Sequence, residues 1–430
     1  MKNIVIASTF ILVCLFGISC SKADDSTRDD PDTIGNETII SFGAKKIKTD
    51  IYTSGGGPVV PMWTYKMPTT DYANGAGFEK PASAEHSVVW QPKTREEGAF
   101  NHFVALTTFN GKQYIMWGNH PFGEDAPGQR ILISSSASWG SWSAPGELFP
   151  PPCPVVPEAE TNNGPHLTPD RWVIADGNLY AVVYVHSANW RYPIARQVNA
   201  DDTFGKFFLV TNMPSNAQLP DFMKEDPDAF KVPAIGAKIL QWYKDNDQIS
   251  WWANANDGIQ RPGVGGESLI ETFMYRANDN SLILMFRNHG IPSNPVHNNR
   301  IYVTMNNGSG GWTTPYPTDI PDAPSRSEVV KGPDGMIYLI GNQIVFPFDQ
   351  PRYLDRDPLT VSVSKDGYQY YKAFSLRSGA PKTYRFPGVA RRNPGFAYPS
   401  SIIVGDWLYT SYSVGKEEIG ISRVKLADLK

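Results

Sequence analysis

The sequence has little cysteine, almost no net charge and no cofactor motif. Its 430 residues contain three cysteines and carry a formal net charge of -4. So small a charge argues against a nucleic-acid partner. The sequence contains no phosphate-binding loop, no dinucleotide fingerprint and no His-Glu-x-x-His zinc motif, so we expect no cofactor.

Long apolar runs are also scarce, and the one at the N-terminus is too short to span a membrane. Residues 1–20 therefore indicate an export signal. The ending "GISC" resembles a bacterial lipoprotein cleavage site, with Gly17 where Leu is usual. The resemblance implies that Cys20 is lipidated and that residues 21–36 form a flexible acidic tether. The expected location is the outer membrane, with exposure on the cell surface, the periplasm and ordinary secretion as alternatives. Only Cys153 then remains, so we expect no disulfide within the mature chain. We also expect a monomer that is held to the membrane by its lipid alone.

Glycine, proline and aromatic residues are plentiful, which is typical of short strands joined by turns. A turn, a strand, a polar loop and a second strand recur five times. The instances are "NGKQYIMWGNHPF", "DGNLYAVVYVHSANWRYP", "DNSLILMFRNHGIP", "DGMIYLIGNQIVFP" and "GDWLYTSYSVGKEE". This repeat predicts an all-β fold, a β-propeller of four-stranded antiparallel blades over residues 37–430. A β-sandwich with long loops is the alternative.

Five blades are clear from the repeat, and a sixth is expected. Residues 200–265 have room for it, or for a large inserted loop, and "AKILQWYKDNDQISWWANAND" within them indicates a hairpin. The segment 38–48 is expected to close the ring by pairing with the last blade.

Ionisable residues gather where propeller geometry brings loops together. In an antiparallel blade, the start of the first strand and the loop from the second to the third strand lie on one face. The opposite loops, such as "FNGK" and "ADGN", are short and plain. We therefore predict a site at one mouth of the channel, with solvated polar loops as the alternative. The residues at these positions include His102, His120, Glu124, Asp125, Arg130, His166, His186, Tyr192, Glu267, Arg287, His289, Arg326, Arg356, Asp357 and Tyr398.

Three segments at the same place in successive units resemble degenerate Asp boxes. "SVSKDGYQYY" keeps Ser364, Asp366 and Gly367, while "TMNNGSGGWTTP" and "SSSASWGSWSAP" keep fewer positions. With these motifs, residues 85–430 resemble the sialidase-like superfamily of Asp-box (BNR-repeat) proteins. The resemblance implies a six-bladed propeller and carbohydrate chemistry. The Arg-Ile-Pro motif that begins the arginine triad of sialidases is missing, which leaves the sugar open.

The resemblance implies an exo-acting glycoside hydrolase for a terminal, acidic sugar of a glycan. Tyr398 would be the nucleophile beside Glu267, and Asp125 or Glu124 the acid. Arginine binds carboxylates through a planar fork, so arginines from three blades are expected to hold the substrate. The expected substrate-binding residues are Arg287, Arg326, Arg356, Asp357, His186, Tyr192 and His289.

Two other functions remain open from the sequence. A polysaccharide lyase would cleave a uronate-containing glycan by β-elimination, using His102 and His120 with Tyr192 or Tyr398. A non-catalytic propeller would bind glycans on tryptophan platforms, although core packing is expected for Trp117. The tryptophans considered are Trp117, Trp190, Trp251 and Trp252.

Overall fold

The computed structural model describes most of the chain. The described residues are 58–67, 75–157, 164–250, 268–288, 299–306, 311–344, 355–389 and 393–430, with three strands between residues 32 and 51. The predicted signal and Cys20 lie outside them. None of the described helices is long and apolar enough to cross a membrane.

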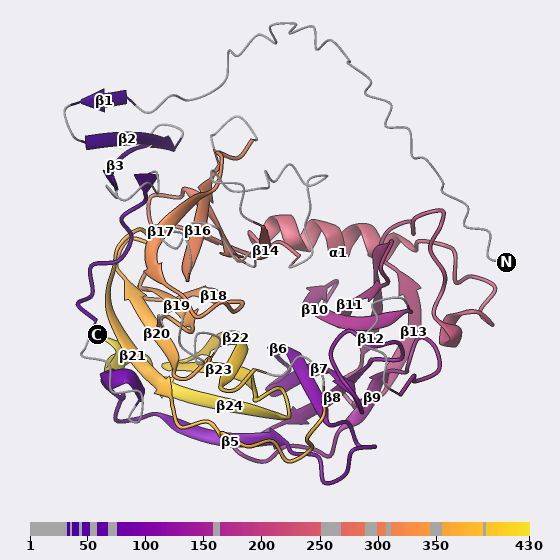
Figure 1. The fold of residues 1–430 in the computed structure, drawn as a ribbon. Coiled ribbons are helices and arrows are strands. Elements are labelled where there is room, and N and C mark those ends of the chain that lie inside the picture. Colours follow the sequence, from indigo (N-terminus) through magenta and orange to yellow (C-terminus); the bar gives the residue numbers. More distant parts are fainter. Residues whose placement is uncertain are drawn as a thin grey trace, which may run out of the picture.

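Five four-stranded antiparallel sheets surround a central channel (Figure 1). Blade 1 contains β6 (Phe100–Phe109), β7 (Lys112–His120), β8 (Arg130–Ser136) and β9 (Gly146–Phe149). Blade 2 contains β10 (His166–Ala175), β11 (Asn178–His186), β12 (Arg191–Val198) and β13 (Phe204–Leu209). Blade 3 contains β14 (Leu269–Arg276), β15 (Leu282–Asn288), β16 (Arg300–Met305) and β17 (Tyr316–Pro321). Blade 4 contains β18 (Glu328–Lys331), β19 (Ile337–Gly341), β20 (Leu359–Ser364) and β21 (Tyr370–Arg377). Blade 5 contains β22 (Phe396–Val404), β23 (Trp407–Val414), β24 (Glu418–Lys425) and β5 (Glu85–Trp90). The prediction of a β-propeller with four-stranded antiparallel blades is confirmed.

An N-terminal strand completes the last blade, but not the strand predicted from the sequence. β5 pairs with β24 and lies just before blade 1 in the chain. Residues 38–48 instead fall in β2 (Glu37–Phe42) and β3 (Lys45–Ile51), which pair with each other. They belong to a separate sheet with β1 (Asp32–Ile34) and β4 (Pro58–Val59). The predicted closing strand was therefore wrong, because those residues use their backbone groups among themselves.

A helix, α1 (Ala234–Asp245), stands where a hairpin was predicted. Its apolar residues Ile235, Ile239, Trp242 and Tyr243 follow helical spacing and pack against blade 2. The next residues reach blade 3, where Asp247 accepts a hydrogen bond of 2.7 Å from Arg276 Nε. Helix α1 thus lies between blades 2 and 3 (Figure 1). The described residues form five blades, and the sixth predicted within residues 200–265 is not among them.

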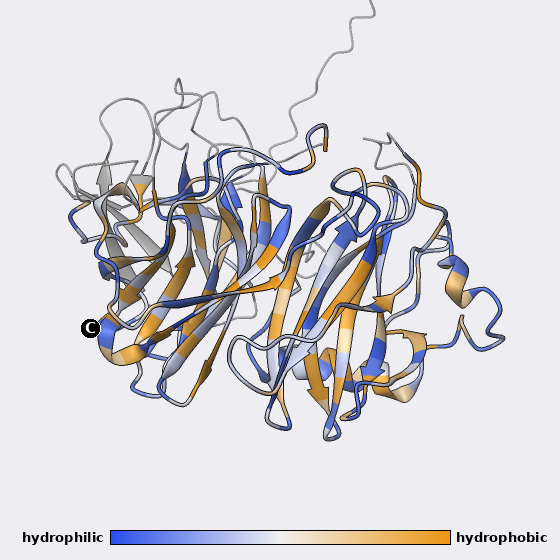
Figure 2. Ribbon diagram, turned by 90° about the horizontal axis from the view of Figure 1, so that it is seen from below, coloured by the Kyte–Doolittle hydropathy of each residue, from blue (hydrophilic) through white to orange (hydrophobic). Residues whose placement is uncertain are grey.

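Hydrophobic side chains fill the spaces between neighbouring blades. Met116 and Ile131 of blade 1, for example, lie in one cluster with Val183 and Ile194 of blade 2. Figure 2 shows the hydrophobic segments within the strands and the hydrophilic ones mainly in the loops at their ends. Each buried side chain of this size contributes about 1.5–3 kcal/mol. Trp117 is fully buried, which confirms its predicted place in the core.

The best-preserved Asp box forms the turn between the third and fourth strands of blade 4. Asp366 Oδ1 accepts backbone hydrogen bonds from Tyr368 (2.7 Å) and Gln369 (2.9 Å). Ser364 Oγ accepts another from Gly367, at 2.9 Å. Gly367 has φ 91°, a conformation that favours glycine. The motif therefore satisfies the backbone donors of a tight turn, and lies where the sequence predicted it.

Candidate active site

Three innermost strands share a β-bulge at the same place. The pairing register shifts just after His102 in β6, Ile270 in β14 and Ala397 in β22. The next residues, Phe103, Glu271 and Tyr398, have φ of 58°, 55° and 56°. Such backbone strain costs about 1–3 kcal/mol for a residue other than glycine and is concentrated at functional sites. A bulge also redirects side chains, and here it brings two of them into contact across the channel.

Tyr398, Glu271 and Arg287 form a closed triangle of hydrogen bonds. The Tyr398 hydroxyl donates to the Glu271 carboxylate and accepts from Arg287 Nη1 at 2.7 Å. The same Nη1 lies 2.9 Å and 3.0 Å from the two oxygens of Glu271. All three side chains are almost completely buried. The described partner of Tyr398 is therefore Glu271, whereas Glu267 lies outside the described residues.

Burial and charge set opposite protonation states on this pair. Burial raises the pKa of Tyr398 well above its ordinary value, although Arg287 and Arg356 oppose the shift. Burial also opposes ionisation of Glu271, but Arg287 and the hydrogen bond from Tyr398 together hold its pKa below the usual value. The resting pair is thus a neutral phenol that donates its proton to a carboxylate, the arrangement of a nucleophile with its base.

Arg356 faces the ring of Tyr398, with its guanidinium carbon 5.4 Å from the ring centre. Its Nη2 donates to the carbonyl of Pro324 at 2.9 Å. Its Nε and Nη1 are buried and have no hydrogen-bond partner among the described residues. Two donors of a buried arginine are thus uncommitted beside Tyr398, and buried donors usually have partners.

Arg326, the third arginine of the predicted clamp, has a different place. Its Nη1 donates to the carbonyl of Pro399 at 2.7 Å, and its Nη2 lies 3.7 Å from Glu328. It therefore supports the backbone directly after Tyr398 from within the channel. Two of the three predicted arginines, Arg287 and Arg356, gather around the Tyr398 ring and hydroxyl.

A buried ion pair supplies another cation beside His102, whose ring packs against Tyr398. Lys416 Nζ lies 2.6 Å from Glu124 Oε2, and both side chains are buried. His102 packs its ring 4.1 Å from the Tyr398 ring, between centres, and its Nδ1 bonds to Ser413 Oγ at 2.7 Å. Burial, reinforced by Lys416, lowers the pKa of His102 well below its usual value. His102 is therefore a neutral ring that supports Tyr398.

Asp322 is a second buried carboxyl group in the field of these arginines. Burial raises its pKa well above the ordinary value, although Arg287 and Arg356 act in the opposite direction. Its Oδ1 is buried without a hydrogen-bond partner among the described residues. Glu271 and Asp322 thus titrate in opposite directions, which is how a base and an acid are recognised in one site.

Asp125 and His186 belong to a neighbouring cluster between blades 1 and 2. His166 Nε2 lies 3.7 Å from Asp125 Oδ1, and the His166 and His186 rings stack at 5.3 Å between centres. Burial lowers the pKa of His186 well below its usual value, and the nearby His166 adds to this shift. The described contacts of Asp125 and His186 lie within this cluster.

Three further predicted residues hold local structure. His120 Nδ1 accepts backbone hydrogen bonds from Phe122 and Gly123, both at 3.1 Å, and its Nε2 bonds to the Pro127 carbonyl at 3.3 Å. The buried Tyr192 donates to the carbonyl of Gln218. Asp357 accepts from the backbone of Gly379 and Ala380. The ionisable residues of the loop after β7 therefore have different roles. His120 shapes the loop, and Glu124 reaches the channel. His289 lies outside the described residues.

The described side chains around Tyr398 carry one excess positive charge at neutral pH. The cations are Arg287, Arg356 and Lys416, and the ionised carboxylates are Glu271 and Glu124. This balance is suited to a ligand with a single negative charge. No group of three or more His, Cys, Asp or Glu among the described residues could hold a metal ion.

The sequence analysis did not predict Glu271 as a site residue, because its position beside Tyr398 depends on how the strands pair. Its residue type and its place near a strand start are ordinary, and Glu267 has a similar place in the sequence. Aligning the inner strands on their shared bulge puts Glu271 at the position of Tyr398. That alignment needs the register of each pair, which the strand pattern alone does not contain.

Sequence and structure comparisons place the fold among known proteins. Residues 236–411 match the model of the BNR repeat-like domain. No curated protein sequence matches the chain. Among solved structures, a sialidase is similar with a TM-score of 0.62 at 17% identity, over 85% of this chain and 35% of that one. The chain thus spans about a third of that sialidase's length, and the likeness concerns the fold.

Two further solved structures are similar at lower scores. A protein of unknown function from Dyadobacter fermentans has a TM-score of 0.48 at 10% identity, over 80% of this chain and 99% of that one. A mutant of Trypanosoma rangeli sialidase that displays trans-sialidase activity has a TM-score of 0.46 at 11% identity, over 82% and 58% of the two chains.

Proposed function

We propose that this five-bladed propeller, of which residues 236–411 match the BNR repeat-like domain, is an exo-acting glycoside hydrolase for a terminal acidic sugar. One observation carries the proposal: the Tyr398 hydroxyl is held between the Glu271 carboxylate and the Arg287 guanidinium. A phenol that already donates to a buried carboxylate is prepared to attack an electrophilic carbon.

In the proposed reaction, Tyr398 attacks the anomeric carbon and passes its proton to Glu271. The departing oxygen takes a proton from Asp322, the buried carboxyl group whose pKa burial raises well above its ordinary value. Water then displaces the tyrosine and gives one proton to Asp322, while the tyrosine recovers its own proton from Glu271. Arg287, which contacts both Tyr398 and Glu271, stabilises negative charge on the phenolic oxygen as its proton leaves.

The charge of the site supports an acidic sugar as substrate. The described surroundings have three cations for two carboxylates. Arg356 Nε and Nη1 have no partner among the described residues, and a substrate carboxylate would supply one. An anionic substrate would repel a carboxylate nucleophile, whereas a neutral tyrosine avoids that cost.

The test is incubation of the purified protein with sialylated and uronate-containing glycans, followed by mass spectrometry and ultraviolet absorbance. Hydrolysis adds one water to the products and forms no double bond. We expect Tyr398→Phe and Glu271→Gln each to remove most of the activity. Tyr275→Phe is the matched control, because it removes a buried hydroxyl on β14 that donates to the Gly367 carbonyl at 2.7 Å, away from Tyr398. Its activity should match that of the wild type.

Two outcomes would replace this proposal. Products that absorb as unsaturated uronates would establish β-elimination. Retention on a glycan array without any cleavage, unchanged by Tyr398→Phe, would establish a binding propeller.

A further inference from the structure

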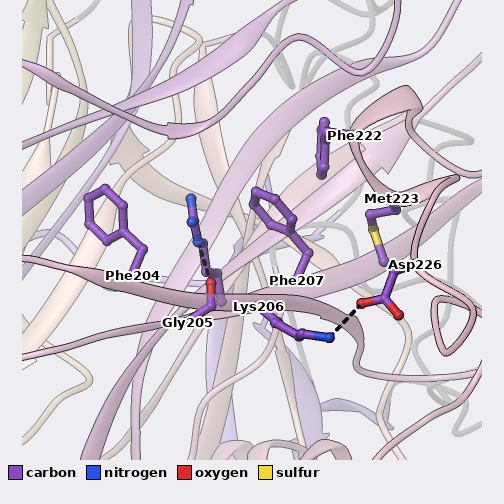
Figure 3. Close-up of a pocket in the computed structure, with 8 residues that line it drawn as sticks. Phe204, Gly205, Lys206, Phe207, Phe222, Met223 and Asp226 are labelled. Atoms are coloured by element: carbon purple, nitrogen blue, oxygen red, sulfur yellow. Dashed lines mark hydrogen bonds and ion pairs between the residues drawn. The ribbon is translucent and has the colours of Figure 1, made fainter.

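A groove of about 500 Å³ lies on the outer edge of blade 2, between β13 and the short helix η2 (Asp221–Met223). β13 is the outermost strand of its blade, whereas β10 is the innermost. Three phenylalanines line the groove, and the Phe207 and Phe222 rings lie 4.5 Å apart between centres (Figure 3). Sites for small molecules typically have volumes of about 300–1,000 Å³. The groove is therefore large enough for one small ligand, outside the site at Tyr398.

The positive charge of Arg196 lies in this groove and has only carbonyl partners among the described residues. The Arg196 guanidinium carbon is 4.8 Å from the centre of the Phe204 ring and 4.3 Å from that of Phe207. Its Nε donates to the Gly205 carbonyl at 2.7 Å, and its Nη1 to the Leu148 carbonyl at 2.8 Å. No acidic side chain among the described residues forms an ion pair with it, and burial alone lowers its pKa.

Arg423 is a second arginine that lies between two aromatic rings, and it also has a carboxylate partner. Its guanidinium carbon lies 4.5 Å and 4.4 Å from the ring centres of Trp139 and Trp407. Glu85 Oε2 then accepts hydrogen bonds from Arg423 Nε at 3.1 Å and Nη2 at 2.8 Å. Both arginines are held between aromatic rings, but only Arg423 has its charge balanced by a carboxylate. A half-buried charge is costly without such a partner.

We propose that the groove binds a small organic anion in which an apolar ring carries a carboxylate. The carboxylate binds the Arg196 guanidinium, and the ring packs among the phenylalanines. The polar side chains of the groove are few, and Lys206 and Asp226 lie 3.4 Å from each other (Figure 3). A sugar, with several hydroxyl groups, would find few partners there. The Lys206 side chain is 85% exposed, so it adds positive charge at the rim.

The experiment is a calorimetric titration of the full protein with phenylacetate and with its neutral analogue, phenylacetamide. We expect phenylacetate to bind at least about tenfold more tightly, since a charge-assisted hydrogen bond is lost with the amide. Arg196→Met should weaken phenylacetate binding by about tenfold or more. Arg423→Met, which alters the stack that already has its carboxylate, should leave the affinity unchanged.

Lys206→Glu gives a second test that leaves the fold intact, because the side chain lies mostly in solvent. It reverses a charge at the rim and should weaken phenylacetate binding several-fold, while phenylacetamide is unaffected. Glucuronate serves as the sugar probe. Equal affinity for acid and amide, tighter binding of glucuronate than of phenylacetate, or binding unchanged by Lys206→Glu would each overturn the proposal. If Arg196→Met fails to fold, the amide comparison and Lys206→Glu decide it.

Discussion

The ion pair between Lys416 and Glu124 offers a direct test of how the channel mouth is held together. The two residues come from blades 5 and 1, lie 2.6 Å apart, and have side chains that are only 4% and 9% exposed. At an effective dielectric constant of about 20, their gross attraction is about 6 kcal/mol, and desolvation of both groups offsets much of it. Lys416→Met keeps the length of the side chain but leaves Glu124 buried without its cation. Removing one partner of a buried pair costs about 3–5 kcal/mol, so we expect a loss of that size at pH 7.

Urea unfolding measures this loss, and a double mutant assigns it to the pair. Lys416→Met/Glu124→Gln removes both charges and should regain about 2 kcal/mol or more relative to Lys416→Met. Lys112→Met is the matched control. Lys112 Nζ lies 3.0 Å from Asp202 Oδ2, but the two side chains are 32% and 46% exposed. It should cost about 1 kcal/mol or less. The reasoning fails if Lys416→Met costs no more than Lys112→Met, or if the double mutant regains nothing.

The same lysine predicts a dependence on alkaline pH. Burial lowers the pKa of Lys416 from 10.5 to about 8, with Glu124 opposing the shift. Above about pH 8 the folded protein loses this proton, so the surroundings of Glu124 lose one positive charge. The KM for an acidic substrate should therefore rise as the pH increases above 8, as measured in steady-state assays. This dependence should disappear in Lys416→Met.

Three further predictions concern other parts of the molecule. Arg356→Lys keeps the charge but loses the planar fork, so we expect the KM for an acidic glycoside to rise about tenfold or more in steady-state assays. An unchanged KM would show that Arg356 does not bind the substrate. Asp366→Ala removes the acceptor of the blade 4 turn and should lower the free energy of unfolding by about 1–3 kcal/mol, measured in urea. Cys20→Ser should move the exported protein from the membrane fraction to the soluble fraction, and continued membrane association would refute the predicted lipid anchor.

Much of the fold could be predicted because its signals are local. Asp-Gly and Asn-Gly turns flanked by apolar strands recur, and each sets up its own hairpin. Helix α1 was mistaken for a hairpin because a short apolar segment fits either element, and packing against blade 2 decides between them. The closing strand was misplaced because edge pairing depends on which segment reaches β24, and β5 is the one that does.

The site raises a related point. Propeller geometry predicted that strand ends converge whatever the side chains are, and among the predicted residues Arg287 and Arg356 do contact Tyr398. The sequence does not distinguish a polar residue that faces the channel from one that fastens its own loop. His120 has the composition of a site residue, yet both of its ring nitrogens bond within the loop. The contacts in the structure are needed to tell a residue that faces the channel from one that fastens its own loop.

The candidate site depends on the whole ring. Tyr398 comes from blade 5, Glu271 and Arg287 from blade 3, and Glu124 from blade 1, so neighbours in space are 111 to 292 residues apart in sequence. No single blade contains both the phenol and its base. Strained backbone at Glu271 and Tyr398 is affordable only where the surrounding structure holds it, and here two blades on different sides of the channel do so. Just after helix α1, Asp247 accepts a hydrogen bond from Arg276 of β14, the strand that carries Glu271. The segment that the sequence pattern missed therefore connects blade 2 to the strand that carries the base of the candidate site.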